Sequence, residues 1–357
     1  MLFDPTTIRS LHLDNRVVMA PLTRSRAVEA NTPNALMAEY YAQRAGAGLI
    51  IAEGTAPSPN GLGYARIPGL FNSAQVAGWK QVTDAVHARG GRMVVQLMHT
   101  GRVSHVDNLP AGAEVLGPTS ETLPGEVHTD RHGMRPYSPP RAMDGSDIAR
   151  AIGEYANAAR LAIEAGFDGV EVHAANGYLV EQFLNANVNT RRDDWGGSAA
   201  GRNRFALEVI RAAAAAIGAD RVGVRLSPYG VFNATGAFDG VEEQYLELVR
   251  ALSALGLLYV HVLDHSAMGA PPVPAAFKRA LRTAFDGPFI LAGGFDAASA
   301  EAALQAGDAD LIAFGRPMLA NPDLVERMRR GAALNPPDMA TFYTPGAAGY
   351  TDYPVLA

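Results

Sequence analysis

Three polar side chains follow a short apolar run in the segment Gly169-Val-Glu-Val-His-Ala-Ala-Asn-Gly-Tyr178. The run is typical of a buried strand, so His173, Asn176 and Tyr178 come directly after the strand's carboxyl end. His173 and Asn176 can each donate a hydrogen bond to a carbonyl oxygen, and the phenol of Tyr178 is a weak acid. A carbonyl held by two donors beside an acid is suited to adding hydride across a polarised double bond. The hydride source must lie elsewhere.

Eight apolar runs, each followed by a helical pattern, predict the elements that position these residues. The predicted strands are 17–20, 48–52, 92–97, 169–173, 221–226, 258–262, 288–292 and 311–314. The predicted helices are 34–45, 73–89, 144–165, 199–217, 241–255, 274–284, 296–306 and 321–330. Eight successive strand–helix units favour a (β/α)8 TIM barrel over a doubly wound sheet.

The whole chain, 1–357, is therefore predicted to form one barrel domain. Residues 98–143, rich in proline, glycine and histidine, interrupt the third unit. An excursion of this length is usually functional, so we expect it to cap the catalytic face. Residues 331–357 are predicted to form a C-terminal loop segment.

Polar residues also follow the other predicted strands, where a barrel of this kind builds its active site. Thr23 follows the first strand, Gly54 the second, and Gln96 and Arg225 stand at the ends of the third and fifth. A buried Arg225 would need an anionic partner. That partner is either a carboxylate such as Glu171 or a cofactor ring that gains negative charge on reduction.

Glycine motifs follow the seventh and eighth strands, where TIM barrels usually bind phosphate. They are Gly293-Gly294 and Gly315-Arg316. Glycine lets the backbone approach an anion, and arginine adds a charged fork. Either motif alone is equally explained as a tight turn, but the pair on adjacent strands favours a phosphate site.

A metal-dependent lyase or hydrolase is the alternative reading, with His261, Asp264 and His265 as possible ligands after the sixth strand. No third histidine or glutamate clearly joins them, so we expect no metal site. A barrel that binds a phosphorylated ligand without turnover is a third possibility.

Composition limits the classes of partner. The net charge of −6 argues against nucleic-acid and anionic-membrane surfaces, and the lack of cysteine excludes disulfides and thiolate metal sites. Small molecules are the expected partners. The first residues do not resemble a secretory signal, and no apolar run is long enough to span a bilayer, so a cytoplasmic protein is expected.

With these residues in place, the sequence resembles the old yellow enzyme family of FMN-dependent ene-reductases. The likeness is greatest to the branch of pentaerythritol tetranitrate reductase and N-ethylmaleimide reductase. Six segments match in order across the chain: 15–24, 95–102, 169–178, 189–198, 313–316 and 349–354. Each is weak alone, but their order makes the resemblance specific.

The resemblance implies a non-covalently bound FMN whose phosphate lies on the two glycine motifs. Thr23 would hydrogen-bond the flavin O4, Gln96 would contact the pyrimidine edge, and Arg225 would stabilise charge at N1 and O2. Backbone groups of Pro21 and Gly54 would complete this side. Tyr343 would lie at the outer edge of the flavin.

The resemblance also implies the reaction. NADPH, with NADH as an alternative, would reduce the flavin, and flavin N5 would deliver hydride to the β-carbon of an α,β-unsaturated carbonyl compound. His173 and Asn176 would hold the substrate oxygen, and Tyr178 would protonate the α-carbon. Tyr64 and Tyr343 are further candidates for substrate contact.

The substrate range implied by the resemblance extends to maleimides, nitroalkenes and nitrate esters. Met98 stands where nitroaromatic reducers of the branch carry tryptophan, which makes nitroaromatic activity less expected. Arg131 and Arg141 are candidates for contacting the NADPH phosphate. A monomer or weak homodimer is expected.

Overall fold

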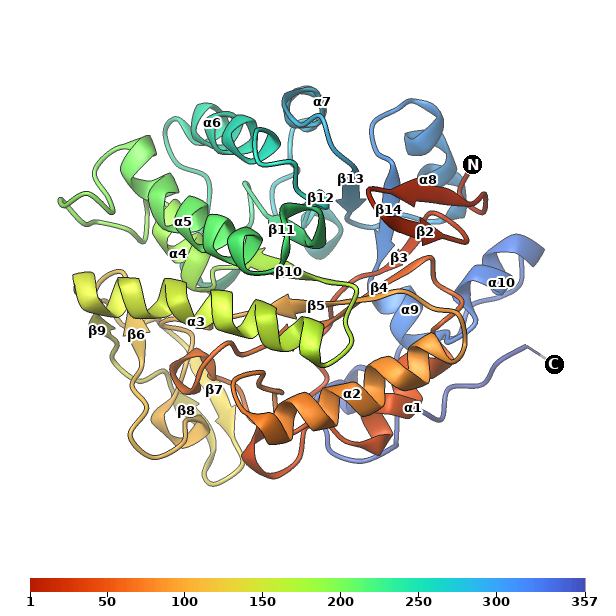
Figure 1. The fold of residues 1–357 in the computed structure, drawn as a ribbon, viewed down its shortest axis with the longest axis horizontal. Helices are drawn as coiled ribbons and strands as arrows, with labels where there is room; N and C mark the ends of the chain where they lie inside the picture. Colours follow the sequence, from red (N-terminus) through yellow and green to blue (C-terminus); the bar gives the residue numbers. More distant parts are fainter. Residues whose placement is uncertain (357) are drawn as a thin grey trace.

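Eight parallel strands close into a barrel in the computed structural model, which describes residues 1–356 (Figure 1). The strands are β3 (Val17–Met19), β4 (Leu49–Thr55), β5 (Met93–Leu97), β10 (Gly169–Ala174), β11 (Val222–Leu226), β12 (Tyr259–Leu263), β13 (Phe289–Ala292) and β14 (Leu311–Phe314). They follow chain order, and β14 pairs with β3 to complete the circle. This confirms the predicted TIM barrel.

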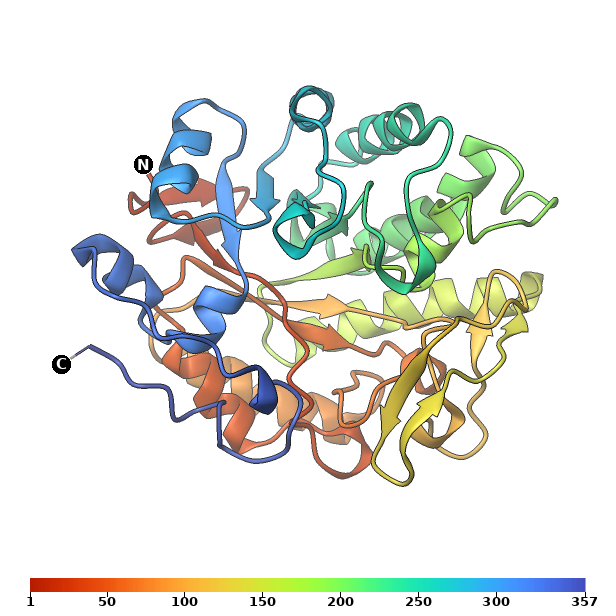
Figure 2. The same ribbon diagram turned by 180° about the vertical axis from the view of Figure 1, so that it is seen from behind.

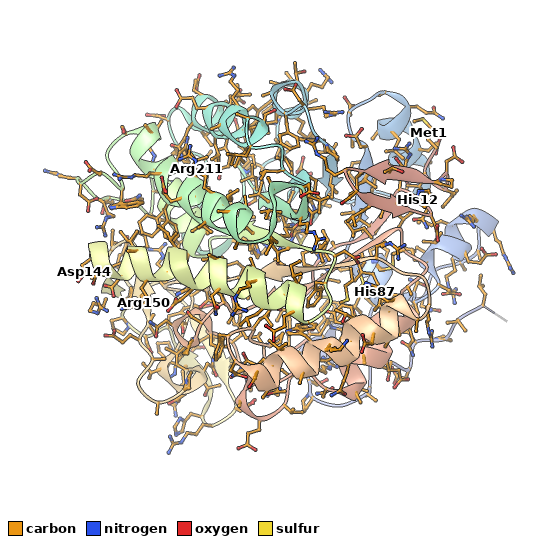
Figure 3. All side chains as sticks on the ribbon, viewed as in Figure 1. Met1, His12, His87, Asp144, Arg150 and Arg211 are labelled. Carbon is orange, nitrogen blue, oxygen red and sulfur yellow. The ribbon has the colours of Figure 1, made fainter. Side chains whose placement is uncertain are left out.

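Helices between the strands form the outer layer, close to the predicted bounds. They are α1 (Ala35–Gln43), α2 (Ser73–His87), α3 (Gly145–Glu164), α5 (Ala199–Ile217), α6 (Val241–Ser253), α7 (Ala275–Ala284), α8 (Ala297–Gln305) and α10 (Leu324–Arg330). Polar N-caps begin several of them, and Asp144, labelled at the start of α3 in Figure 3, forms a capping box with Asp147. Two short helices, α4 (Leu179–Leu184) and α9 (Arg316–Ala320), were not predicted. Short 3₁₀ helices occupy 29–31, 59–61, 106–108, 219–221, 232–234, 266–268 and 339–341.

Alternation along each strand separates two layers of core. Val17 and Met19 pack outward against the helices, whereas Val18 belongs to the cluster that fills the barrel interior. By the same period of two, Val94 faces inward and Gln96 comes next on that face. The interior is thus apolar at the amino ends of the strands and becomes polar toward their carboxyl ends.

An N-terminal hairpin that was not predicted closes the apolar end of the barrel. It pairs β1 (Thr6–Ile8) with β2 (Leu11–Leu13), and Ile8, Leu11 and Leu13 join the interior cluster. The amino group of Met1, labelled in Figure 3, lies 2.8 Å from Glu301 on α8. Because this end is plugged, the opposite mouth is the open end.

The excursion predicted at 98–143 lies between β5 and α3 and has its own small sheets. They pair β6 (Leu116–Gly117) with β9 (Arg141–Ala142), and β7 (Glu126–Thr129) with β8 (Gly133–Pro136). Figure 2 shows the β7–β8 hairpin in yellow. None of the described helices is long and apolar enough to cross a membrane.

Two buried arginines tie the C-terminal segment to the loop after β3. The guanidinium of Arg24 donates to the carbonyls of Phe342 and Gly349, at 3.1 and 2.7 Å. Arg26 donates to the carbonyls of Phe342 and Thr341, at 2.7 and 2.8 Å. These bonds hold 341–349 beside the barrel mouth (Figure 2).

Candidate active site

A cavity of about 560 Å³ opens at the carboxyl ends of the strands. It brings together nearly all of the predicted site residues, namely Pro21, Thr23, Tyr64, Gln96, His173, Asn176, Tyr178, Arg225, Gly293, Gly294, Gly315, Arg316 and Tyr343. Gly54 does not line this cavity. A Cβ at position 54 would overlap the sulfur of Met98, which lines the cavity instead.

His173, at the end of β10, is a neutral hydrogen-bond donor. Its pKa lies well below the ordinary value because burial and the nearby charge of Arg225 oppose protonation. The backbone N–H of Ala175 donates to Nδ1 of His173 at 3.2 Å. A neutral ring that accepts at Nδ1 carries its proton on Nε2. Nε2–H is therefore the group that His173 offers to a ligand.

Asn176 lies in the loop after β10 with a left-handed backbone, φ 59°. Its N–H donates to Oγ of Ser227 at 2.9 Å, and its carbonyl accepts from Asn233 at 2.7 Å. Its side-chain oxygen lies 2.9 Å from Nε2 of His265. The backbone and the carboxamide of Asn176 are thus both fixed from outside the loop.

Tyr178 occupies the N-cap position of α4. Its hydroxyl lies 3.1 Å from the hydroxyl of Tyr64. Its ring packs edge-on against that of His173 with centroids 4.9 Å apart. Burial raises the pKa of Tyr178 to about 12, while the hydrogen bond from Tyr64 acts in the opposite direction. Tyr178 is therefore protonated at neutral pH, next to the imidazole of His173.

Arg225 on β11 is a buried cation with no ion pair among residues 1–356; burial lowers its pKa, and the nearby charge of Glu171 opposes that effect. Its side chain is 5% exposed, and within residues 1–356 its Nε has no hydrogen-bond acceptor. The carboxylate of Glu171 is instead engaged by His261 at 2.9 Å and by the amide nitrogen of Gln96 at 2.7 Å. A buried guanidinium that Glu171 compensates only through its nearby charge, without a direct ion pair, fits an additional anionic ligand at the cavity wall.

The glycine motifs form the opposite side of the same cavity. Gly293 has φ 137°, and a Cβ there would overlap the carbonyl oxygen of Asp264. A Cβ at Gly315 would meet no other protein atom closer than 3.7 Å, so the absence of a side chain leaves open space. The only neighbour of the Arg316 guanidinium among the described hydrogen bonds is the sulfur of Met268, at 3.8 Å. This side fits a phosphate group.

A second cavity of about 790 Å³ adjoins the first and shares Thr23, Tyr64, Tyr178 and Tyr343 with it. Its remaining walls come from the β7–β8 hairpin, the C-terminal segment and the loops that carry Ser25 and Arg66. Arg66 forms an ion pair with Asp130 in the hairpin turn. The predicted cap therefore lies beside the site.

The two arginines suggested for a nicotinamide phosphate are not brought to either cavity lining. Arg141 lies on β9, where its guanidinium pairs with Glu114 at 2.8 Å and Asp147 at 2.6 Å. Arg131 lies in the turn of the β7–β8 hairpin and is exposed.

The residues of the metal alternative are separately engaged. His261 pairs with Glu171, Asp264 accepts from Lys278 at 3.0 Å, and His265 contacts Asn176. In the described part of the chain, no group of three His, Asp or Glu residues is arranged to hold a metal ion. The site does not favour a metal-dependent lyase or hydrolase.

An open barrel mouth with glycines on one side and a buried arginine on the other fits a phosphorylated cofactor that carries negative charge. The chain matches the NADH:flavin oxidoreductase / NADH oxidase family over residues 1–335 and belongs to that family, which includes the old yellow enzymes. It is 43% identical to chanoclavine-I aldehyde reductase of Penicillium roqueforti, with 99% of this chain and 95% of the relative covered. It is 41% identical to 12-oxophytodienoate reductase 7 of Oryza sativa, covering 99% and 94%.

Solved structures agree with this assignment. Morphinone reductase superposes with a TM-score of 0.95 at 45% identity, covering 99% of this chain and 96% of that one. The old yellow enzyme homologue from Zymomonas mobilis superposes with a TM-score of 0.95 at 39% identity, covering 99% of each chain. The protein is therefore an FMN-dependent oxidoreductase of the old yellow enzyme type.

Sequence reasoning missed the residues that hold the site in place. Ser227 and Glu181 fix the loop after β10, since Ser227 donates to Glu181 at 2.9 Å and Glu181 accepts from the N–H of Gly177. Burial raises the pKa of Glu181 to about 7. The sequence signal for Ser227 is its position as a polar residue directly after strand β11.

Proposed function

We propose that the protein reduces the activated C=C bond of α,β-unsaturated carbonyl compounds, using bound FMN and a nicotinamide donor. The observation that carries this proposal is the meeting of three groups in one cavity: the Nε2–H of His173, the carboxamide of Asn176 and the protonated phenol of Tyr178. The unpaired Arg225 in the same wall supports a cofactor that carries negative charge.

His173 and Asn176 hold the substrate oxygen. Hydrogen bonds from both draw electron density toward that oxygen, which leaves the β-carbon electron-poor and stabilises the enolate as it forms. Because His173 is neutral, it donates a hydrogen bond without placing a second positive charge beside Arg225 in the buried cavity.

Tyr178 supplies the proton to the α-carbon. A phenol with a pKa near 12 keeps its proton until a stronger base, such as the carbon of a developing enolate, is next to it. The hydrogen bond with Tyr64 stabilises the phenolate that remains, and therefore makes Tyr178 a better acid.

The remaining residues hold the cofactor, which supplies hydride when bound. Arg225 would neutralise charge that accumulates on the ring, and Thr23 and Gln96 would hydrogen-bond its polar edge. One N–H of the Gln96 amide is engaged by Glu171, so its second N–H and its amide oxygen remain for the ring. The backbone at Gly293, Gly294 and Gly315 would hold the phosphate with Arg316.

The cavity favours enones over nitroaromatics, with maleimides, nitroalkenes and nitrate esters as further substrates. Met98 forms a flexible apolar part of the cavity wall, whereas stacking of a nitroaromatic ring would require an aromatic side chain there. The adjoining tyrosine-lined cavity gives room for a larger substituent, in keeping with relatives named for the reduction of chanoclavine-I aldehyde and 12-oxophytodienoate.

The nicotinamide donor is proposed to be NADPH, with NADH as the alternative. Arg141 is held by two carboxylates, so the exposed Arg131 is the remaining candidate for the additional phosphate of NADPH. Rates of flavin bleaching with each donor, in the unaltered protein and in Arg131→Gln, test this assignment. A preference for NADH that Arg131→Gln leaves unchanged would contradict it.

Absorbance of the purified protein tests the proposed function. The expected result is a yellow protein whose flavin band bleaches on anaerobic addition of NADPH or NADH and returns when 2-cyclohexenone is added. A colourless preparation, or a bleached flavin that an enone does not reoxidise, would overturn the proposal.

A further inference from the structure

Asn176 can hold a carbonyl oxygen only in one of its two side-chain orientations. A carboxamide presents either its NH2 group or its oxygen to the cavity, and only the NH2 group donates. Asn176 lines the cavity with its Oδ1 directed to His265, at 2.9 Å from Nε2. The orientation of Asn176 therefore depends on which atom of His265 carries the proton.

The surroundings of His265 select the Nε2–H form. Within residues 1–356, Nδ1 of His265 is buried without a hydrogen-bond partner. A proton on Nδ1 would leave a buried N–H donor with no acceptor, which costs about 1–3 kcal/mol. A proton on Nε2 instead meets the side-chain oxygen of Asn176.

His265 is also neutral. Burial and the charge of Arg225 lower its pKa to about 4, against the opposing effect of Asp264. Therefore only one ring nitrogen carries a proton at neutral pH. A neutral ring with its proton on Nε2 has a single N–H group, and that group donates to the oxygen of Asn176.

The ring of His265 is held rigidly. It is 2% exposed and packs edge-on against Phe232, with ring centroids 4.7 Å apart. Gly230 lies so close that a Cβ there would be 3.1 Å from Nδ1 of His265. A fixed donor can therefore act on the carboxamide of Asn176 without rearranging.

We propose that His265 is a positioning residue whose Nε2–H holds the oxygen of Asn176, so that the NH2 group faces the substrate carbonyl. This inference rests on the proposed role of Asn176 as a donor. The proposal gives a role to a histidine that the sequence alone suggested as a metal ligand. It also makes the second hydrogen-bond donor to the substrate carbonyl, Asn176, depend on the loop after β12.

Infrared spectroscopy of a bound carbonyl tests this role without turnover. The probe is 2-cyclohexenone labelled with ¹³C at the carbonyl, bound to the oxidised holoenzyme, in which the C=O stretching frequency falls as hydrogen bonds strengthen. His265→Leu removes the donor, and His265→Gln restores an N–H group. We expect His265→Leu to lose part of the frequency shift and to weaken enone binding about 5-fold, as for one hydrogen bond, and His265→Gln to regain much of both.

The Asn176→Ala background separates the possible failures. In that background His265→Leu should cause no further change, because the group through which it acts is gone. If Asn176→Ala itself leaves the shift and binding unchanged, the proposed donor role of Asn176 fails. If Asn176→Ala reduces both but His265→Leu does not, the positioning role alone is wrong.

The tautomer can be measured without a destabilising substitution. ¹⁵N NMR of histidine-labelled protein distinguishes protonated from unprotonated ring nitrogens, with the signal of His265 assigned by its loss in His265→Gln. The expected result is a neutral ring protonated on Nε2. A ring protonated on Nδ1 would overturn the proposal, even if His265→Leu fails to fold.

Discussion

The two sides of the cavity are built differently. On the donor side, formed by His173, Asn176 and Tyr178, each functional group is a side chain with a hydrogen-bond partner in the protein. On the glycine side, formed by Gly293, Gly294, Gly315 and Arg316, the shape of the backbone is the main feature, and Arg316 is exposed.

The difference indicates how binding and chemistry are divided. Side chains held in fixed directions can stabilise charge that develops during a reaction without reorganising. Open backbone next to an exposed arginine accommodates a group that does not change during the reaction. Substitutions on the donor side should therefore lower rates, whereas those on the glycine side should lower retention of the flavin.

The largest effect on stability is expected from Gly293→Ala. A Cβ at this position would overlap Asp264, and alanine disfavours the positive φ of this residue. We expect the free energy of unfolding to fall by roughly 2 kcal/mol or more and the flavin to be lost on gel filtration. Gly315→Ala is the matched control, since its Cβ meets open space. It should keep the fold but bind FMN about 10-fold more weakly; equal stability of both variants would contradict the difference.

Arg225→Met should have opposite effects on the apoprotein and the holoprotein. Removing a buried charge that has no hydrogen-bond acceptor at Nε among residues 1–356 is expected to stabilise the apoprotein by about 1 kcal/mol, net of the lost attraction to Glu171. The same change should weaken FMN binding about 10- to 100-fold, because a charged hydrogen-bond donor is lost. Urea unfolding and fluorescence titration with FMN measure the two effects. A destabilised apoprotein would show that Arg225 has a structural partner.

Tyr64→Phe should have a smaller effect that is confined to the donor side. Loss of the hydrogen bond raises the pKa of Tyr178 further, so protonation of the substrate slows, by about 5-fold for one hydrogen bond. Stopped-flow reoxidation of the reduced protein by 2-cyclohexenone measures this step. The rate of flavin reduction by the nicotinamide donor should not change. A slower reduction would show that the effect of Tyr64 is not confined to protonation of the substrate.

Acid should lower the free energy of unfolding through the buried His99, which contacts the start of α4. Burial lowers the pKa of His99 to about 3, and its carbonyl accepts from the N–H of Leu179 at the start of α4. Between pH 6.5 and 3 the unfolded chain binds a proton at this residue that the folded chain does not, so stability falls as pH falls. Near pH 5.5 the contribution of His99 to the free energy of unfolding should be about 1 kcal/mol lower than at neutral pH, while Glu181, whose pKa burial raises to about 7, acts in the opposite direction.

His99→Asn checks this pH effect, because it can keep the acceptor for the N–H of Gly101 but does not titrate. Its unfolding free energy should fall by about 1 kcal/mol less between pH 7 and pH 5.5 than that of the unaltered protein. An identical pH dependence in the two proteins would show that His99 does not supply this term.

The barrel and the strand-end residues could be predicted because they follow from local patterns. Short apolar runs, each followed by a helical pattern, placed the strands, and the position of His173 or Arg225 at a strand end was enough to assign each to the mouth. The N-terminal hairpin and α4 were missed because each is short, and their apolar residues gain from burial against distant parts of the chain.

The partners of the site residues could not be predicted, because a sequence gives the type of a side chain but not its direction. Asn176 and His265 are 89 residues apart, and Tyr64 and Tyr178 are 114 apart. The first contact also depends on a left-handed backbone at Asn176. The sequence suggested His265 only as a possible metal ligand, because it follows Asp264 directly, and did not indicate its contact with Asn176.

Tyr178→Phe, followed separately in the two half-reactions, tests the central claim most directly. We expect flavin reduction by the nicotinamide donor at an unchanged rate, and reoxidation by 2-cyclohexenone slowed by about 100-fold or more, as for loss of a general acid. Reoxidation at the unaltered rate would contradict the role of Tyr178 as the proton donor.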